Sequence, residues 1–127
     1  MTDNFFIPAL ALLTVLGSIV VSFTASFFDP IPPFRISRTT VYAPKFEGRL
    51  MANGRIFHEK DMVAASNFYP LGTTLSVTNL RNGVTITIVV QDRTSEKYHG
   101  LDLSEAAFDA LQIPRRDGWT LVKTKKR

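Results

Sequence analysis

The chain has 127 residues, no cysteine and a formal net charge of +4. Without cysteine there are no disulfides, no thiolate metal sites and no cysteine-linked lipid. The excess charge lies entirely in Lys123, Lys125, Lys126 and Arg127. The remaining basic residues only balance the acidic ones, which argues against a nucleic-acid partner. We therefore expect one small domain with an appendage, and no metal or cofactor.

The appendage is an apolar segment near the N-terminus. Phe5–Phe28 contains no charged residue, and as a helix it is long enough to cross a hydrocarbon core of roughly 30 Å. Signal peptides have a shorter apolar stretch and a basic start, whereas no Lys or Arg precedes Phe5. Residues 1–28 are therefore predicted to be an uncleaved transmembrane anchor. The small residues Thr24–Ser26 leave cleavage open as the alternative.

A stripe of small hydroxyl side chains runs along this predicted helix. Its members recur every four residues and are Thr14, Ser18, Ser22 and Ser26. Small residues let helix backbones approach in lipid, so we predict packing against another integral membrane protein. The alternative is that each hydroxyl bonds the carbonyl four residues earlier within its own helix.

Turn residues and alternating patterns follow the anchor. Residues 29–38 contain three prolines and are predicted to be an extended linker, 39–123 a β domain, and 124–127 a basic tail. Leu75–Asn79 and Val84–Val90 alternate with a period of two around Asn82-Gly83, a pair that favours the positive φ angles of a hairpin turn.

The second half of this hairpin has one apolar face. Its members are Val84, Ile86, Ile88 and Val90, and the next residue on the same face is Asp92. One helix is expected after the hairpin, capped by Ser104, with Phe108 in its apolar stripe and Pro114 as its stop. Trp119–Val122 is expected to be a closing strand.

Five sequence blocks occur in the order and spacing of a known family. They are Met51–Phe57, Ala64–Thr73, Val77–Gly83, Gln91–Ser95 and Leu101–Ser104. With these blocks the chain resembles the RlpA (rare lipoprotein A) family, whose barrel expansins share. The resemblance implies a mainly β fold: a small double-psi β-barrel with one short crossover helix, here preceded by a single transmembrane helix.

The same resemblance implies lytic cleavage of peptidoglycan by a Glu, a His and an Asp that converge in a groove. In this chain the Glu position is Arg55, the His position is Ser66, and only Asp92 is kept. The predicted groove residues are Arg55, Ser66, Asp92 and Arg93. We expect Arg55 to bond Asp92 and hold it ionised, the opposite of what a proton donor needs.

Several other residues leave alternatives open. His58, Glu59, Glu96 and His99 are the remaining groups that could reach the groove, and surface positions are the simpler reading. Asp102 is expected to be structural, with a catalytic role as its alternative. Asp92 either takes part in binding or accepts hydrogen bonds from nearby backbone amides. The aromatic residues Tyr42, Phe46, Phe57, Phe68, Tyr69 and Tyr98 are available for sugar stacking or for the core.

These observations favour a non-catalytic barrel that serves as a binding or assembly subunit of a membrane or cell-envelope complex. The alternatives are a lytic transglycosylase with a rearranged site and a non-enzymatic binder of peptidoglycan or another carbohydrate. A role on peptidoglycan requires the barrel to lie outside a bacterial inner membrane, in the periplasm. The basic residues Arg35, Arg38, Lys45 and Arg49 after the anchor favour the cytoplasmic side instead.

Overall fold

A computed structural model of the protein describes residues 33–127. Neither of the two short helices within that range has the length or the apolar composition of a membrane span. The predicted anchor at 1–28 and its hydroxyl stripe lie outside the described residues, so both stay predictions.

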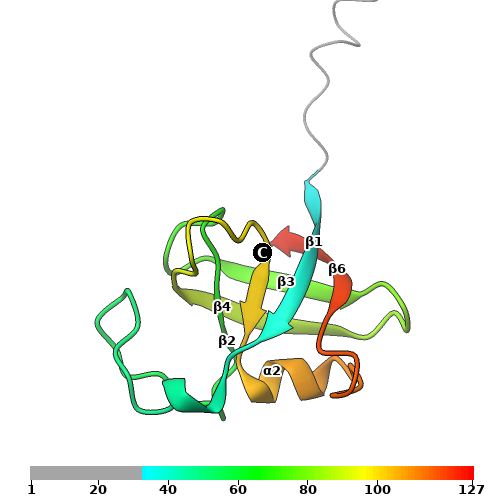
Figure 1. Ribbon diagram of the computed structural model, residues 1–127. Helices are drawn as coiled ribbons and strands as arrows, with labels where there is room; N and C mark the ends of the chain where they lie inside the picture. The colour runs from blue at the N-terminus through cyan, green and yellow to red at the C-terminus, as the bar shows by residue number, and fades with distance from the viewer. Residues whose placement is uncertain (1–32) are drawn as a thin grey trace, which may run out of the picture. The chain divides into compact units, whose positions relative to one another are not determined.

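Six strands close into a barrel in the order β1-β5-β2-β4-β3-β6 (Figure 1). The strands are β1 (Phe34–Val41), β2 (Val63–Ala65), β3 (Thr74–Asn79), β4 (Thr85–Asp92), β5 (Leu101–Leu103) and β6 (Thr120–Lys126). Two pairs, β1 with β5 and β2 with β4, are parallel, and the other neighbours are antiparallel. The short helix η1 (Pro44–Phe46) lies between β1 and β2, and α2 (Glu105–Ala110) lies between β5 and β6; neither of these two strand pairs is adjacent in the barrel, so both connections cross over. The predicted mainly β barrel with a short crossover helix is confirmed.

The predicted apolar row of β4 does face the barrel interior. Ile88 and Val90 are fully buried, and Val84 and Ile86 pack against the same core. Asp92 was expected to continue this row, but a register shift between Ala64 and Ala65 takes it to the opposite face. The helix α2 closes one end of this core with Phe108, which is inaccessible to solvent. Ser104 caps α2 as predicted, since its hydroxyl accepts a hydrogen bond from the Ala107 amide.

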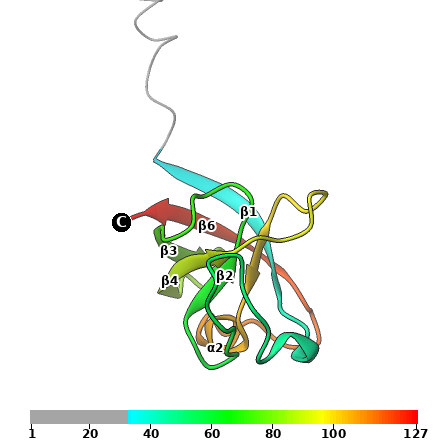
Figure 2. The same cartoon turned by 90° about the vertical axis from the view of Figure 1, so that its left-hand side faces the viewer.

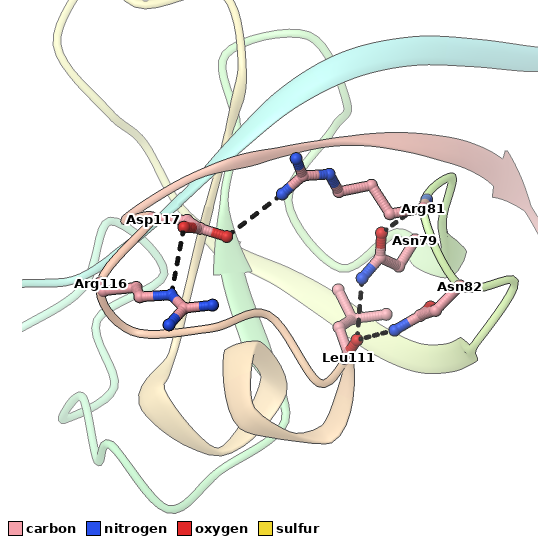
Figure 3. A network of polar contacts seen from close by, with 6 residues as sticks. All are labelled: Asn79, Arg81, Asn82, Leu111, Arg116 and Asp117. Atoms are coloured by element: carbon pink, nitrogen blue, oxygen red, sulfur yellow. Dashed lines mark hydrogen bonds and ion pairs between the residues drawn. The ribbon is translucent and has the colours of Figure 1, made fainter.

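The β3–β4 turn differs from the predicted hairpin turn. Of the pair Asn82-Gly83, only Gly83 has a positive φ, at 75°. The Asn82 side chain accepts from the Val84 amide and donates to the carbonyl of Leu111, to which Asn79 also donates (Figure 3). The turn is therefore wider than a two-residue turn, and its asparagines bind it to the end of α2.

The barrel extends beyond both predicted boundaries. Strand β1 begins at Phe34, inside the predicted linker, and β6 continues to Lys126, inside the predicted tail; Phe34 pairs with Lys125. The start of β1 was not predicted from the sequence because its inward side chains, Ser37 and Thr39, are polar and give no apolar alternation. Thr39 is satisfied inside the barrel by donating to the Leu101 carbonyl at 2.9 Å.

Candidate functional site: a groove with two carboxyl groups

Strand register brings two aspartates to one face of the barrel. Ala65 of β2 pairs with Asp92 of β4 on one side and with Asp102 of β5 on the other. Asp102 pairs in turn with Thr40 of β1. Residues directly opposite one another project to the same face of a sheet. A register shift between Ala64 and Ala65 sets Asp92, and not Gln91, opposite Ala65.

Asp92 is fixed by three donors at the end of β4. One carboxylate oxygen accepts a hydrogen bond from the Tyr42 hydroxyl at 2.8 Å. The other accepts from the backbone amides of Ala52 and Arg93, both at 2.8 Å. Burial raises the pKa of Tyr42, and the bond to Asp92 raises it further. Tyr42 therefore stays a neutral donor, and Asp92 is a carboxylate held in one orientation.

Asp102 lies in a different environment from Asp92. Its only hydrogen-bond donor within residues 33–127 is the Thr40 hydroxyl, at 3.1 Å. Burial raises the pKa of Asp102 to about 6, and the negative charge of Asp92 contributes, while the bond from Thr40 acts in the opposite direction. Burial thus favours the protonated form of Asp102, while Asp92 beside it is held in place by three hydrogen-bond donors. A proton donor beside a fixed polar group is an arrangement found in acid catalysis.

Both aspartates line a cavity of about 360 Å³, called here the acidic groove. Its lining residues are Tyr42, Phe46, Ala65, Asp92, Arg93, Thr94, Ser95 and Asp102. The half-exposed Phe46 ring meets Tyr42 edge to face, with the ring centroids 5.8 Å apart. An aromatic ring beside carboxyl groups matches the apolar and hydroxylated faces of a sugar. In Figure 2, two segments that contribute lining residues, the loop after β4 (yellow) and η1 (teal), lie to the right of β2 and β4.

The predicted bond between Arg55 and Asp92 is absent. Among residues 33–127 the Arg55 guanidinium makes no ion pair and no hydrogen bond, and the side chain is exposed; only the Arg55 backbone amide donates, to the Asn53 side chain. The prediction was wrong because the backbone amide of Ala52, and not a side chain from this turn, reaches Asp92. Arg55 is therefore no lining residue of the acidic groove.

Ser66 and Arg93 have structural contacts in this fold. Ser66 is 2% exposed, and its hydroxyl accepts from the amides of Phe68 and Tyr69. The Arg93 guanidinium donates to the carbonyls of Ser66 and Tyr69, at 2.5 and 2.7 Å. Arg93 thereby joins the end of β4 to the turn after β2, at one wall of the groove.

We expect Arg93→Met to lower the free energy of unfolding by about 1–3 kcal/mol, because it leaves two carbonyls without their charged donor. Arg55→Met is the matched control, and its effect should stay within about 0.5 kcal/mol. Urea denaturation of both variants measures the difference. Equal losses in the two variants would contradict the assignment of Arg93 as the structural arginine.

The other candidate groups lie outside the acidic groove. His58 Nδ1 lies 3.0 Å from a carboxylate oxygen of Glu47. The lining residues of the groove do not include Glu59, Glu96 or His99. Phe57 and Tyr69 belong to the core, while the exposed Phe68 ring is covered by the Arg35 guanidinium at 4.0 Å.

The sequence predicted a structural role for Asp102. Asp102 lies in the groove because it pairs opposite Ala65, which also pairs with Asp92, and no pattern in the sequence indicates this pairing.

Fold and site together define a small six-stranded double-psi barrel with a carboxyl-lined groove. The sequence profile of the lytic transglycolase family matches residues 37–124, and the chain belongs to this family. An uncharacterised protein of Synechocystis, ssl3177, is 42% identical over 77 residues, which cover 61% of this chain and 82% of that protein. A probable endolytic peptidoglycan transglycosylase RlpA, also from Synechocystis, is 44% identical over 75 residues, but the match spans 57% of this chain and only 23% of that protein.

Solved structures support the same fold. The expansin of Clavibacter michiganensis has a TM-score of 0.57 and 28% identity, over 74% of this chain and 50% of that one. A mutant of that expansin, at 25% identity and a TM-score of 0.56, was solved in complex with cellohexaose. A Streptomyces papain inhibitor has a TM-score of 0.60 and 26% identity, over 76% of this chain and 96% of that one. Proteins with this barrel therefore include both polysaccharide-related and protein-directed members.

Proposed function

We propose that the acidic groove binds a glycan strand of peptidoglycan and cleaves it, with Asp102 as the proton donor. The observation that carries this proposal is the pair of unlike carboxyl groups, Asp102 with a pKa near 6 and Asp92 held by three donors. The family and the RlpA relatives, named as peptidoglycan transglycosylases, supply the substrate class.

The chemistry follows from the two environments. Protonated Asp102 gives its proton to the glycosidic oxygen, and the bond from that oxygen to the anomeric carbon breaks. The positive charge that develops at the sugar ring is stabilised by the fixed carboxylate of Asp92. A hydroxyl of the same sugar then attacks the anomeric carbon and returns its proton to Asp102. The products are an anhydro sugar and a shortened strand, and Asp102 is regenerated.

A second function has its own support. Arg55 and Ser66 stand where the resemblance implies a catalytic Glu and His, and neither lines the groove. On this reading the barrel keeps its groove but only binds glycan, as a non-catalytic binding or assembly subunit of an envelope complex. Attachment to the inner membrane through residues 1–28, with the barrel in the periplasm, is part of both proposals.

Incubation of the purified protein with peptidoglycan sacculi, followed by mass spectrometry of the soluble fraction, separates the two functions. We expect release of anhydro-muropeptides at a rate that is highest below pH 6 and falls about tenfold per pH unit above it, because only protonated Asp102 is the donor. Binding to sacculi without release at any pH between 5 and 8 would contradict cleavage and favour the binding subunit. Neither binding nor release would exclude both.

A further inference from the structure

The outer side chains of β1 and β6 form a surface that combines apolar and basic residues. Its six members are Phe34, Ile36, Arg38, Leu121, Lys123 and Lys125, called here the basic apolar face. The two strands are antiparallel neighbours, and their register places each apolar member opposite a basic one: Phe34 faces Lys125, Ile36 faces Lys123, and Leu121 faces Arg38.

The apolar members are poorly covered by the rest of the barrel. Phe34 is 46% exposed, Ile36 47% and Leu121 45%. Trp119, directly before β6, is 44% exposed, and the Arg38 guanidinium lies 4.6 Å from the centre of its ring. Apolar side chains gathered on two adjacent strands are a feature of surfaces that contact another phase or molecule.

The charge of this surface has one sign. Strands β1, β3 and β6 contain no Asp or Glu, and the chain continues from β6 with Lys126 and Arg127. Strand β3 places the uncharged Ser76 and Thr78 beside Lys125 and Lys123. The acidic residue in the loop before Trp119 is Asp117, and its carboxylate is paired with Arg81 at 3.1 Å (Figure 3).

We propose that the basic apolar face lies against the surface of a membrane that contains anionic phospholipids. Lysine and arginine attract the phosphate layer, while Trp and Phe rings are stable at the level of the lipid headgroups. Charge complementarity and the mixture of aromatic with basic side chains fit this partner better than a soluble polyanion, which offers nothing to Phe34, Ile36 and Leu121.

The sequence before β1 supports the same partner. The uncharged segment Phe5–Phe28 ends six positions before Phe34. Six residues span at most about 20 Å, so an anchor formed by that segment keeps the start of β1 within this distance of a bilayer. The proposal does not depend on glycan cleavage in the acidic groove.

Trp119 is the only tryptophan of the chain and therefore reports on this surface without a label. The full-length protein is reconstituted into vesicles of phosphatidylcholine, with or without phosphatidylglycerol. With phosphatidylglycerol we expect a blue-shifted Trp119 emission, protection from the neutral aqueous quencher acrylamide, and quenching by lipids brominated near the headgroup. High salt should remove these changes, because it screens exposed charges. Equal acrylamide quenching in both vesicle types would overturn the proposal.

The charged residues are tested by Lys123→Glu together with Lys125→Glu. We expect the ratio of docked to undocked barrel to fall about 30-fold or more, from about 1 kcal/mol for each basic residue at such a surface. Lys60→Glu with Lys97→Glu is the matched control, since it makes the same change of net charge at two exposed positions elsewhere. Equal loss in both double variants would show attraction by net charge alone and overturn the assignment of this face.

Two further outcomes are informative. If soluble polyglutamate protects Trp119 as well as vesicles do, the partner is an anionic polymer and the membrane proposal is wrong. If circular dichroism shows that the Lys123/Lys125 double variant is unfolded, the salt titration of the wild-type protein decides: protection that persists at high salt contradicts the role of the basic residues.

Discussion

Replacing Asp102 with Asn is expected to lower the release of anhydro-muropeptides by about 10²- to 10⁴-fold, the usual contribution of a general acid. Asn keeps the size of the side chain and an oxygen for the Thr40 hydroxyl, which bonds Asp102 at 3.1 Å. It has no proton to transfer to a glycosidic oxygen. The measurement is the initial rate of release from sacculi at pH 5.

The same variant should be more stable than the wild type at high pH. Burial raises the pKa of Asp102 from 3.8 to about 6, so the folded protein binds the proton more tightly than the unfolded chain does. The wild type therefore loses stability as the pH rises from about 4 to about 6, and Asn removes this loss. We expect the free energy of unfolding to increase by about 2 kcal/mol at pH 8 and to change little at pH 4.

Asp61→Asn is the control substitution for these two predictions. Asp61→Asn changes an exposed aspartate outside the acidic groove and should alter neither the rate nor the pH dependence of stability. A loss of stability in Asp102→Asn at pH 8 would mean that the Asp102 carboxylate holds the fold together. The structural role that the sequence suggested for Asp102 would then be correct.

The largest expected effect on stability is that of Phe108→Ala, at about 3–5 kcal/mol. Phe108 is fully buried where α2 closes the core, beside Leu111 and the apolar row of β4. Truncation removes the burial of a whole ring and leaves a cavity that the closed barrel cannot collapse around. Domains of this size are stable by only about 5–15 kcal/mol, so much of the stability is lost.

Phe68→Ala is the control for this loss. Phe68 is exposed, and its ring contacts the Arg35 guanidinium at 4.0 Å, so we expect a cost of about 1 kcal/mol or less. Chemical denaturation of the two variants under identical conditions gives the comparison. Similar losses for Phe68 and Phe108 would contradict the placement of α2 over the core.

Local patterns in the sequence determined much of this protein. The alternation from Val84 to Val90 predicted a strand with one buried face, and the Ser104 cap predicted the helix α2. Both succeeded because hydrogen bonding within a hairpin or helix turn depends on residues close in sequence. The five family blocks predicted the barrel, and the matched family confirmed it.

The two carboxyl groups of the groove were decided by tertiary structure alone. Asp92 and Asp102 are brought to one face because β2 is inserted between their strands, and a register shift at Ala65 selects Asp92. The start of strand β1 was also decided by tertiary structure, since Ser37 and Thr39 are buried only because other strands enclose them. The burial that raises the pKa of Asp102 likewise comes from segments distant in sequence. Pairing between distant strands has no local signal in the sequence. The sequence therefore shows that Asp92 and Asp102 are present, but not that they share a groove or that burial raises the pKa of Asp102.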